Sequence, residues 1–189
     1  MNDDASTTAG GIGRRDFLKI GGAATASLLA GSIAPESVRA GTPPLPFNPR
    51  TQGVMPTRNL GKTGYRVGIF SLGGQAAVEK PDNEAVAVPI VERAIDLGVN
   101  YIDTAAAYGG PQRWSQRYIG QVMARRRNEV WLSSKTNDRT KDGSLRLLDE
   151  SLRLLNTDHL DLWQLHNITT MAQVEQIFGA GGAIEALQQ

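Results

Sequence analysis

Residues 99–103 read Val-Asn-Tyr-Ile-Asp, and residues 130–135 read Val-Trp-Leu-Ser-Ser-Lys. Each is a short apolar run closed by a charged residue, and two similar runs flank them at residues 67–72 and 160–165. The four segments close at Gly73, Asp103, Lys135 and His166. These closing positions are 30, 32 and 31 residues apart. Apolar runs of about four to eight residues fit buried parallel strands, so this regular spacing predicts the fold.

Helical patterns fill the gaps between the runs. One ends at Gly98, a second covers residues 115–127, and a third covers residues 144–155 with an apolar stripe. Pro89 indicates that the first helix begins near it or kinks there. A strand and a helix every 31 residues or so is the pattern of βαβ units, so the class is α/β with a parallel sheet.

The closing residues favour one α/β architecture over another. A doubly wound nucleotide-binding sheet is expected to carry G-x-G-x-x-G after its first strand, and residues 72–77, Leu-Gly-Gly-Gln-Ala-Ala, lack it. Polar residues at the ends of consecutive strands are typical of a parallel (β/α)8 TIM-type barrel, whose chemistry lies at that mouth. Such a barrel has roughly 250 residues. We therefore expect about four of its eight βα units in this chain, as the N-terminal half of a truncated or longer polypeptide.

The N-terminal segment has the features of an export signal. Arg14-Arg15 precedes Phe-Leu-Lys, a weakly apolar stretch covers residues 20–34, and Val-Arg-Ala ends at Ala40. This order of charged, apolar and small-residue regions resembles a twin-arginine signal peptide over residues 1–40. We expect cleavage after Ala40, a periplasmic or other extracytoplasmic location, and the twin-arginine export machinery as a partner. The other reading is an amphipathic helix that carries two arginines.

The rest of the chain divides into a proline-rich segment and a body. Residues 41–56 are dense in proline without a period, which predicts an extended linker, and residues 57–189 remain for the fold. Within that body, residues 57–65 with Gly-Lys-Thr-Gly at 61–64 predict a hairpin.

Composition excludes several functional classes. The 189 residues carry 20 basic and 19 acidic side chains, so the chain lacks the charge excess that nucleic-acid binding needs. Cysteine is absent, which rules out disulfides, thiolate metal sites and a cysteine nucleophile, and two histidines are few for a metal centre. No apolar run reaches about 18 residues, so we expect no membrane span. The lack of cysteine and the small number of histidines lead us to expect no bound metal.

Four side chains are candidates for catalysis: Asp103, Tyr108, Lys135 and His166. A tyrosine is a weak acid unless a cation stabilises its phenolate, and Lys135 is a suitable cation. Asp103 can keep that lysine charged, and His166 can donate a hydrogen bond to a carbonyl oxygen. Such a set serves an oxygen that becomes negative, as in carbonyl reduction. Taken singly, each residue also has an ordinary structural reading as a helix cap, a loop contact or a solvated side chain.

Several motifs resemble the aldo-keto reductase superfamily, in order, over nearly all of residues 57–189. They are Leu60-Gly-Lys-Thr-Gly64, Tyr101-Ile-Asp-Thr-Ala105, Tyr108-Gly109, Ser133-Ser-Lys-Thr136, residues 151–158, Leu160-Asp-Leu-Trp-Gln-Leu-His166 and residues 182–187. One departure is the insertion of residues 110–114, whose Trp114 is either a wall of the substrate pocket or ordinary loop packing.

The resemblance implies NADPH-dependent reduction of an aldehyde or ketone to an alcohol. It makes Tyr108 the proton donor, Lys135 and Asp103 its supporting pair, and His166 the group that positions the carbonyl. It also places Gly74 and Gln75, together with Asp103, near the nicotinamide end of the cofactor. A small carbonyl compound is then the substrate. The alternative is a non-catalytic barrel or half-barrel that binds a partner or senses nucleotide redox state.

Overall fold

The computed structural model describes residues 42–189, and the predicted signal peptide over residues 1–40 lies outside them. The strands are β1 (Thr57–Asn59), β2 (Arg66–Gly68), β3 (Leu72–Gly73), β4 (Tyr101–Asp103), β5 (Trp131–Thr136) and β6 (Leu162–Leu165). The α-helices are α2 (Pro49–Val54), α3 (Glu84–Asp96), α4 (Trp114–Arg126), α5 (Lys141–Leu154), α6 (Met171–Phe178) and α7 (Ala183–Leu187). Short 3-10 helices cover Ala76–Glu79, Gly110–Gln112 and Arg127–Glu129.

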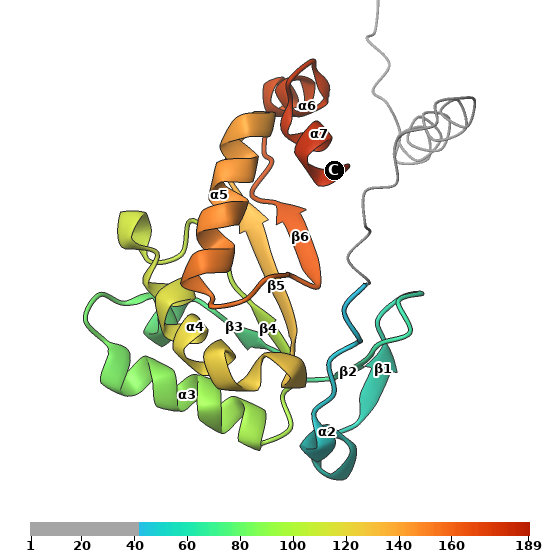
Figure 1. Ribbon diagram of the computed structural model, residues 1–189, viewed down its shortest axis with the longest axis vertical. Helices are drawn as coiled ribbons and strands as arrows, with labels where there is room; N and C mark the ends of the chain where they lie inside the picture. The colour runs from blue at the N-terminus through green and yellow to red at the C-terminus, as the bar shows by residue number, and fades with distance from the viewer. Residues whose placement is uncertain (1–41) are drawn as a thin grey trace, which may run out of the picture. The chain divides into compact units, whose positions relative to one another are not determined.

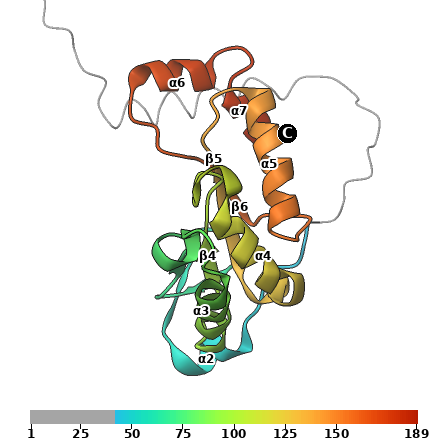
Figure 2. The ribbon, with the colours of Figure 1, turned by 90° about the vertical axis from the view of Figure 1, so that its left-hand side faces the viewer.

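The central feature is a four-stranded parallel sheet in the order β3-β4-β5-β6. Helices α3, α4 and α5 lie on one face of it (Figures 1 and 2). The strands follow the chain order, and each connection passes through a helix, as in a (β/α) barrel. The predicted parallel α/β class is therefore confirmed, with four βα units present.

The core lies between the sheet and these helices. It joins Ile102 of β4 and Leu132 of β5 to buried residues of α3 and α4. Those residues are Val91, Ile95, Ile119, Val122 and Met123. Because successive side chains of a strand point to opposite faces, the residues next to these core positions, Asp103, Ser133 and Lys135, lie on the other face. The sheet thus separates its packing residues from the candidate residues Asp103 and Lys135.

The predicted helices are present with shifted ends. Helix α4 begins at Trp114, and α5 begins at Lys141, where Thr140 caps it by accepting a hydrogen bond from the Gly143 amide at 3.1 Å. Helix α3 begins at Glu84 and continues through Pro89, so it does not start at that proline.

The first apolar run does not form one strand. Residues 66–68 pair with β1 in the predicted hairpin, and only Leu72–Gly73 join the parallel sheet beside β4. The side chain of Asn100 explains the division. It accepts a hydrogen bond from the Gly68 amide at 2.9 Å and donates one to the Arg66 carbonyl at 2.9 Å, and so holds β2 in the hairpin.

The extended linker expected over residues 41–56 differs from the structure, because residues 49–54 form α2. Asn48 caps this helix and is buried, and its amide donates hydrogen bonds to the carbonyls of Ile95 and Val99 at 3.0 Å each. The Thr51 hydroxyl donates to the Gly98 carbonyl at 2.7 Å. Proline density indicated extended chain, but these bonds to the end of α3 dock the segment on the body.

Candidate active site at the carboxyl ends of the strands

Asp103 and Lys135 form an ion pair at the ends of neighbouring strands. The Lys135 ammonium lies 2.5 Å from Oδ2 of Asp103 and also donates to the Thr104 carbonyl at 2.9 Å. Ser133 donates its hydroxyl hydrogen to Oδ1 of Asp103 at 2.6 Å. Both carboxylate oxygens are therefore bonded, and the ammonium lies against a negative charge.

Tyr108 lies above this pair, in the loop that follows β4. Its ring centroid is 5.0 Å from the Lys135 ammonium. The loop is fixed by the hydrogen bond from the Ala106 amide to the Lys135 carbonyl at 3.2 Å and by that from the Tyr108 amide to the Ala105 carbonyl at 3.1 Å. The loop after one strand thus crosses the end of the next and brings the phenol to the cation.

His166 completes the group from the end of β6. Its ring centroid is 5.5 Å from that of Tyr108, and the two planes meet edge to face at 81°. Its amide donates to the Thr136 carbonyl at 2.8 Å. Burial lowers the pKa of His166 below its ordinary value, and the positive Lys135 adds to this effect, while Asp103 opposes it. The imidazole is therefore neutral at pH 7 and holds one N–H donor and one acceptor.

The structure thus brings Asp103, Tyr108, Lys135 and His166 together from the ends of three strands. Of the three residues predicted to contact a cofactor, Asp103 belongs to this group, and Gly74 and Gln75 follow β3, the first strand of the parallel sheet. Gly74 is buried, and its amide donates to the Asp103 carbonyl at 2.7 Å. A Cβ atom there would lie 2.9 Å from that carbonyl oxygen, so only glycine fits. Gln75 is exposed on the next turn.

Sequence reasoning missed two residues of this region. Ser133 lies two positions before Lys135 on β5 and so shares its face, a signal that the alternation of the strand carries. Arg139 reaches the backbone of His166 with its guanidinium, at 2.7 Å from the carbonyl oxygen. No pattern in the sequence predicts that contact, because it depends on the path of the loop after β5.

Trp114, which the sequence left open as a pocket wall or loop packing, packs against a helix. Its ring stacks on that of Tyr118, with centroids 5.6 Å apart and planes at 21°. It lines a surface hollow with Val88, Pro89 and Gln121, between α3 and α4. Trp114 therefore belongs to the helix layer.

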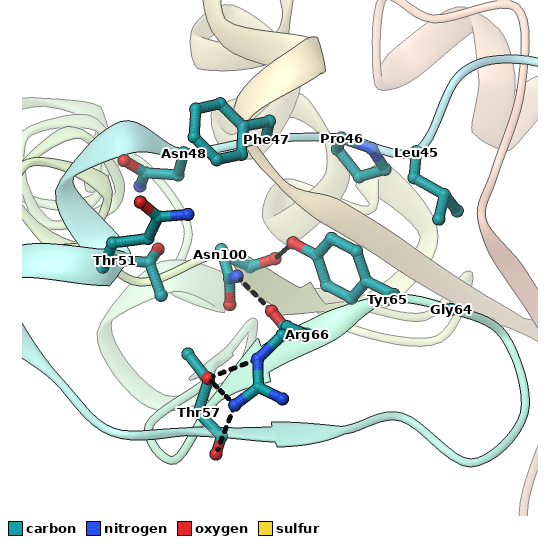
Figure 3. Close-up of a pocket in the computed structure, with 11 residues that line it drawn as sticks. Leu45, Pro46, Phe47, Asn48, Thr51, Thr57, Gly64, Tyr65, Arg66 and Asn100 are labelled. Atoms are coloured by element: carbon teal, nitrogen blue, oxygen red, sulfur yellow. Dashed lines mark hydrogen bonds between the residues drawn. The ribbon is translucent and has the colours of Figure 1, made fainter.

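A cavity of about 300 Å³ lies near the start of β4, between residues 45–52 and the hairpin (Figure 3). Several of its polar groups are already bonded within the protein. The Tyr65 hydroxyl donates to the Asn100 carbonyl at 2.6 Å, and the Arg66 guanidinium bonds Thr57. These bonds hold the hairpin to the sheet, so this cavity is a structural feature and lies at the opposite end of β4 from Asp103.

Two features are absent from residues 42–189. None of their helices is long and apolar enough to cross a membrane. No group of three or more histidine, cysteine, aspartate or glutamate side chains in this part of the chain is arranged to hold a metal ion.

The chain is similar to proteins named as reductases or aldo-keto reductases. The 6-dehydroglucose reductase of Novosphingobium aromaticivorans is 29% identical over an alignment of 134 residues, and the match covers 64% of this chain and 44% of that protein. The holo form of aldo-keto reductase AKR11C1 from Bacillus halodurans superposes with a TM-score of 0.58 at 27% identity, over 71% of this chain and 45% of that one. An aldo-keto reductase from Klebsiella pneumoniae in complex with NADPH has a TM-score of 0.50 at 30% identity, over 59% and 40% of the two chains.

The chain therefore spans less than half the length of these relatives. The model of the aldo/keto reductase family matches residues 66–189, well over half of this chain, and that match includes the whole parallel sheet and its four candidate residues. On this evidence the chain belongs to the aldo/keto reductase family.

Proposed function

We propose that this chain supplies the catalytic residues for the NADPH-dependent reduction of an aldehyde or ketone to an alcohol. The observation that carries the proposal is the meeting of a phenol, an ammonium and a neutral imidazole at one end of the sheet. Three hydrogen-bonding groups of this kind suit a carbonyl oxygen that gains negative charge.

The reaction adds a hydride to the carbonyl carbon and a proton to its oxygen, and NADPH supplies the hydride. Tyr108 donates the proton, so its O–H bond breaks as the new O–H bond of the alcohol forms. The Lys135 ammonium stabilises the phenolate that remains, and Asp103 holds the ammonium in place through their ion pair. Water then returns a proton to Tyr108.

His166 has a separate part in this proposal. Its neutral imidazole donates one hydrogen bond to the carbonyl oxygen and so orients the substrate beside Tyr108. The edge-to-face contact of the imidazole with the phenol ring, with centroids 5.5 Å apart, supports this role. The substrate is accordingly a small carbonyl compound.

The nicotinamide end of the cofactor would lie beside the residues that follow β3. Gly74 packs its backbone against the end of β4, where a Cβ atom would meet the Ser115 hydroxyl and the Asp103 carbonyl, and Gln75 is exposed beside it. We propose that Gly74, Gln75 and Asp103 contact this end. The structure of the Klebsiella relative in complex with NADPH supports the choice of nucleotide.

The alternative function raised by the sequence is a non-catalytic barrel or half-barrel that binds a partner or senses nucleotide redox state without turnover. Two measurements on the full chain separate the functions: NADPH binding by fluorescence, and aldehyde-dependent NADPH oxidation. The reductase proposal expects both, whereas binding without oxidation favours the sensor and excludes catalysis by this chain.

We further propose that the protein is exported through the twin-arginine machinery and is cleaved after Ala40. The paired Arg14-Arg15 and the apolar segment after them support this proposal. N-terminal sequencing of the protein from the cell envelope is expected to begin at Gly41. Replacement of both arginines by lysine is expected to retain the protein in the cytoplasm, and unchanged export of that variant would contradict the proposal.

A further inference from the structure

Arg139 lies in the loop after β5 and contacts the backbone of His166, the residue that follows β6. Its Nη2 donates to the His166 carbonyl at 2.7 Å and to the Asn167 carbonyl at 3.0 Å. Its own carbonyl accepts a hydrogen bond from the Ala183 amide at 2.9 Å, which ties this loop to α7. One guanidinium nitrogen therefore bonds two consecutive carbonyls immediately after the sheet.

The chain turns sharply at this point. Asn167 has a φ of +53°, in the left-handed region that residues other than glycine seldom adopt. The His166 amide before it is fixed to the Thr136 carbonyl at 2.8 Å. The two bonds from Arg139 hold the carbonyls on either side of the Asn167 amide. They stabilise the turn that directs the imidazole toward Tyr108.

Arg139 also carries a charge that has no carboxylate partner among residues 42–189. None of the ion pairs in this part of the chain includes it, and its Nη1 is buried without a hydrogen-bond partner there. The other charged groups that act on the imidazole are Lys135 and Asp103, which are paired with each other. Tyr108 is the remaining titratable group in contact with it. The positive charge of Arg139 is therefore not cancelled where it acts on His166.

We propose that Arg139 is a positioning residue for His166, which holds the turn after β6 and so sets the imidazole beside Tyr108. Its charge has a second effect, since a nearby cation disfavours protonation of the ring and keeps it a neutral donor. The catalytic meaning of this inference rests on the proposed reductase function. The contacts of Arg139 from which it is argued do not depend on that function.

The test is an NMR titration of the two imidazoles in the full chain, which has only His159 and His166. A His166→Asn variant assigns the signals. In Arg139→Gln, which removes the charge, the pKa of His166 is expected to rise, and the nuclear Overhauser contact between its ring and that of Tyr108 to weaken. Arg139→Lys keeps the positive charge but lacks the planar guanidinium. It is therefore expected to change the ring contact between His166 and Tyr108 more than the pKa of His166.

The matched control is Arg146→Gln, which removes an exposed arginine of α5 and is expected to leave both signals unchanged. An unaltered titration and an unaltered ring contact in Arg139→Gln would overturn the inference. If that variant does not fold, the ring contact in Arg139→Lys decides, and an unchanged contact there rejects it. The measurement needs neither NADPH nor aldehyde, so it succeeds or fails independently of the reductase proposal.

Discussion

Replacement of Asp161 by alanine breaks a buried ion pair beneath the sheet. Oδ2 of Asp161 accepts hydrogen bonds from the Arg127 guanidinium and from the Leu132 amide, both at 2.7 Å. The two charged side chains are 8% and 10% exposed. The variant therefore leaves a buried cation without its counter-charge and an amide of a central strand without its acceptor.

Removal of one partner of such a pair costs about 3–5 kcal/mol. Arg127 keeps three other acceptors, the carbonyls of Val130 and His159 and the hydroxyl of Thr157, so we expect the lower end, about 3 kcal/mol. For a body of this size, a loss of 3 kcal/mol corresponds to a fall in melting temperature of roughly 6–12 °C.

Thermal and urea unfolding of the full chain, followed by circular dichroism, measures this loss. Asp158→Ala is the control, because that carboxylate is 94% exposed in its pair with His159 and its loss is expected to leave the melting temperature unchanged. The double variant Arg127→Met with Asp161→Leu is expected to recover part of the lost stability. A loss below about 1 kcal/mol for Asp161→Ala, the value of a surface pair, would refute the reasoning.

Three further predictions concern stability. The folded protein lowers the pKa of His166, so below about pH 6.5 the unfolded state binds more protons than the folded state does. Acidification is therefore expected to lower the melting temperature of the native chain more than that of His166→Asn. Gly120→Ala puts a Cβ against the Leu154 carbonyl, where α4 crosses α5, and is expected to lower the free energy of unfolding in urea by about 1–3 kcal/mol. The control Gly53→Ala places its Cβ in open space and is expected to change that free energy little. Asn48→Ala removes the side-chain donor to the buried Val99 carbonyl and one of the two donors to the Ile95 carbonyl, which keeps its bond from the Gly98 amide. It is expected to cost about 1–3 kcal/mol, and an unchanged unfolding midpoint would show that the segment before β1 is not docked.

The sheet and the four candidate residues could be predicted because both depend on local sequence. Apolar runs mark the strands, and the residue that closes a parallel strand lies at the same edge as its neighbours. The alternation of side chains along a strand also predicts that Asp161 faces away from His166, toward the helix layer. Its pairing with Arg127 agrees with that position.

What the sequence did not reveal depends on contacts between distant segments. The docking of residues 48–51 needs the carbonyls at the end of α3, which no local pattern announces. The division of the first apolar run depends on Asn100, which lies more than thirty residues away. The bond from Arg139 to His166 likewise arises only when two loops meet.

The central claim is that Tyr108 donates the proton in a carbonyl reduction. The measurement that tests it most directly is the rate of aldehyde-dependent NADPH oxidation by Tyr108→Phe at saturating NADPH. The control is Tyr101→Phe, which alters a half-buried tyrosine at the start of β4, the strand before the Tyr108 loop. Loss of the phenol at position 108 is expected to lower the rate by roughly 10²–10⁴-fold while NADPH affinity is kept, and the control is expected to retain the native rate. A native rate in Tyr108→Phe would contradict the account.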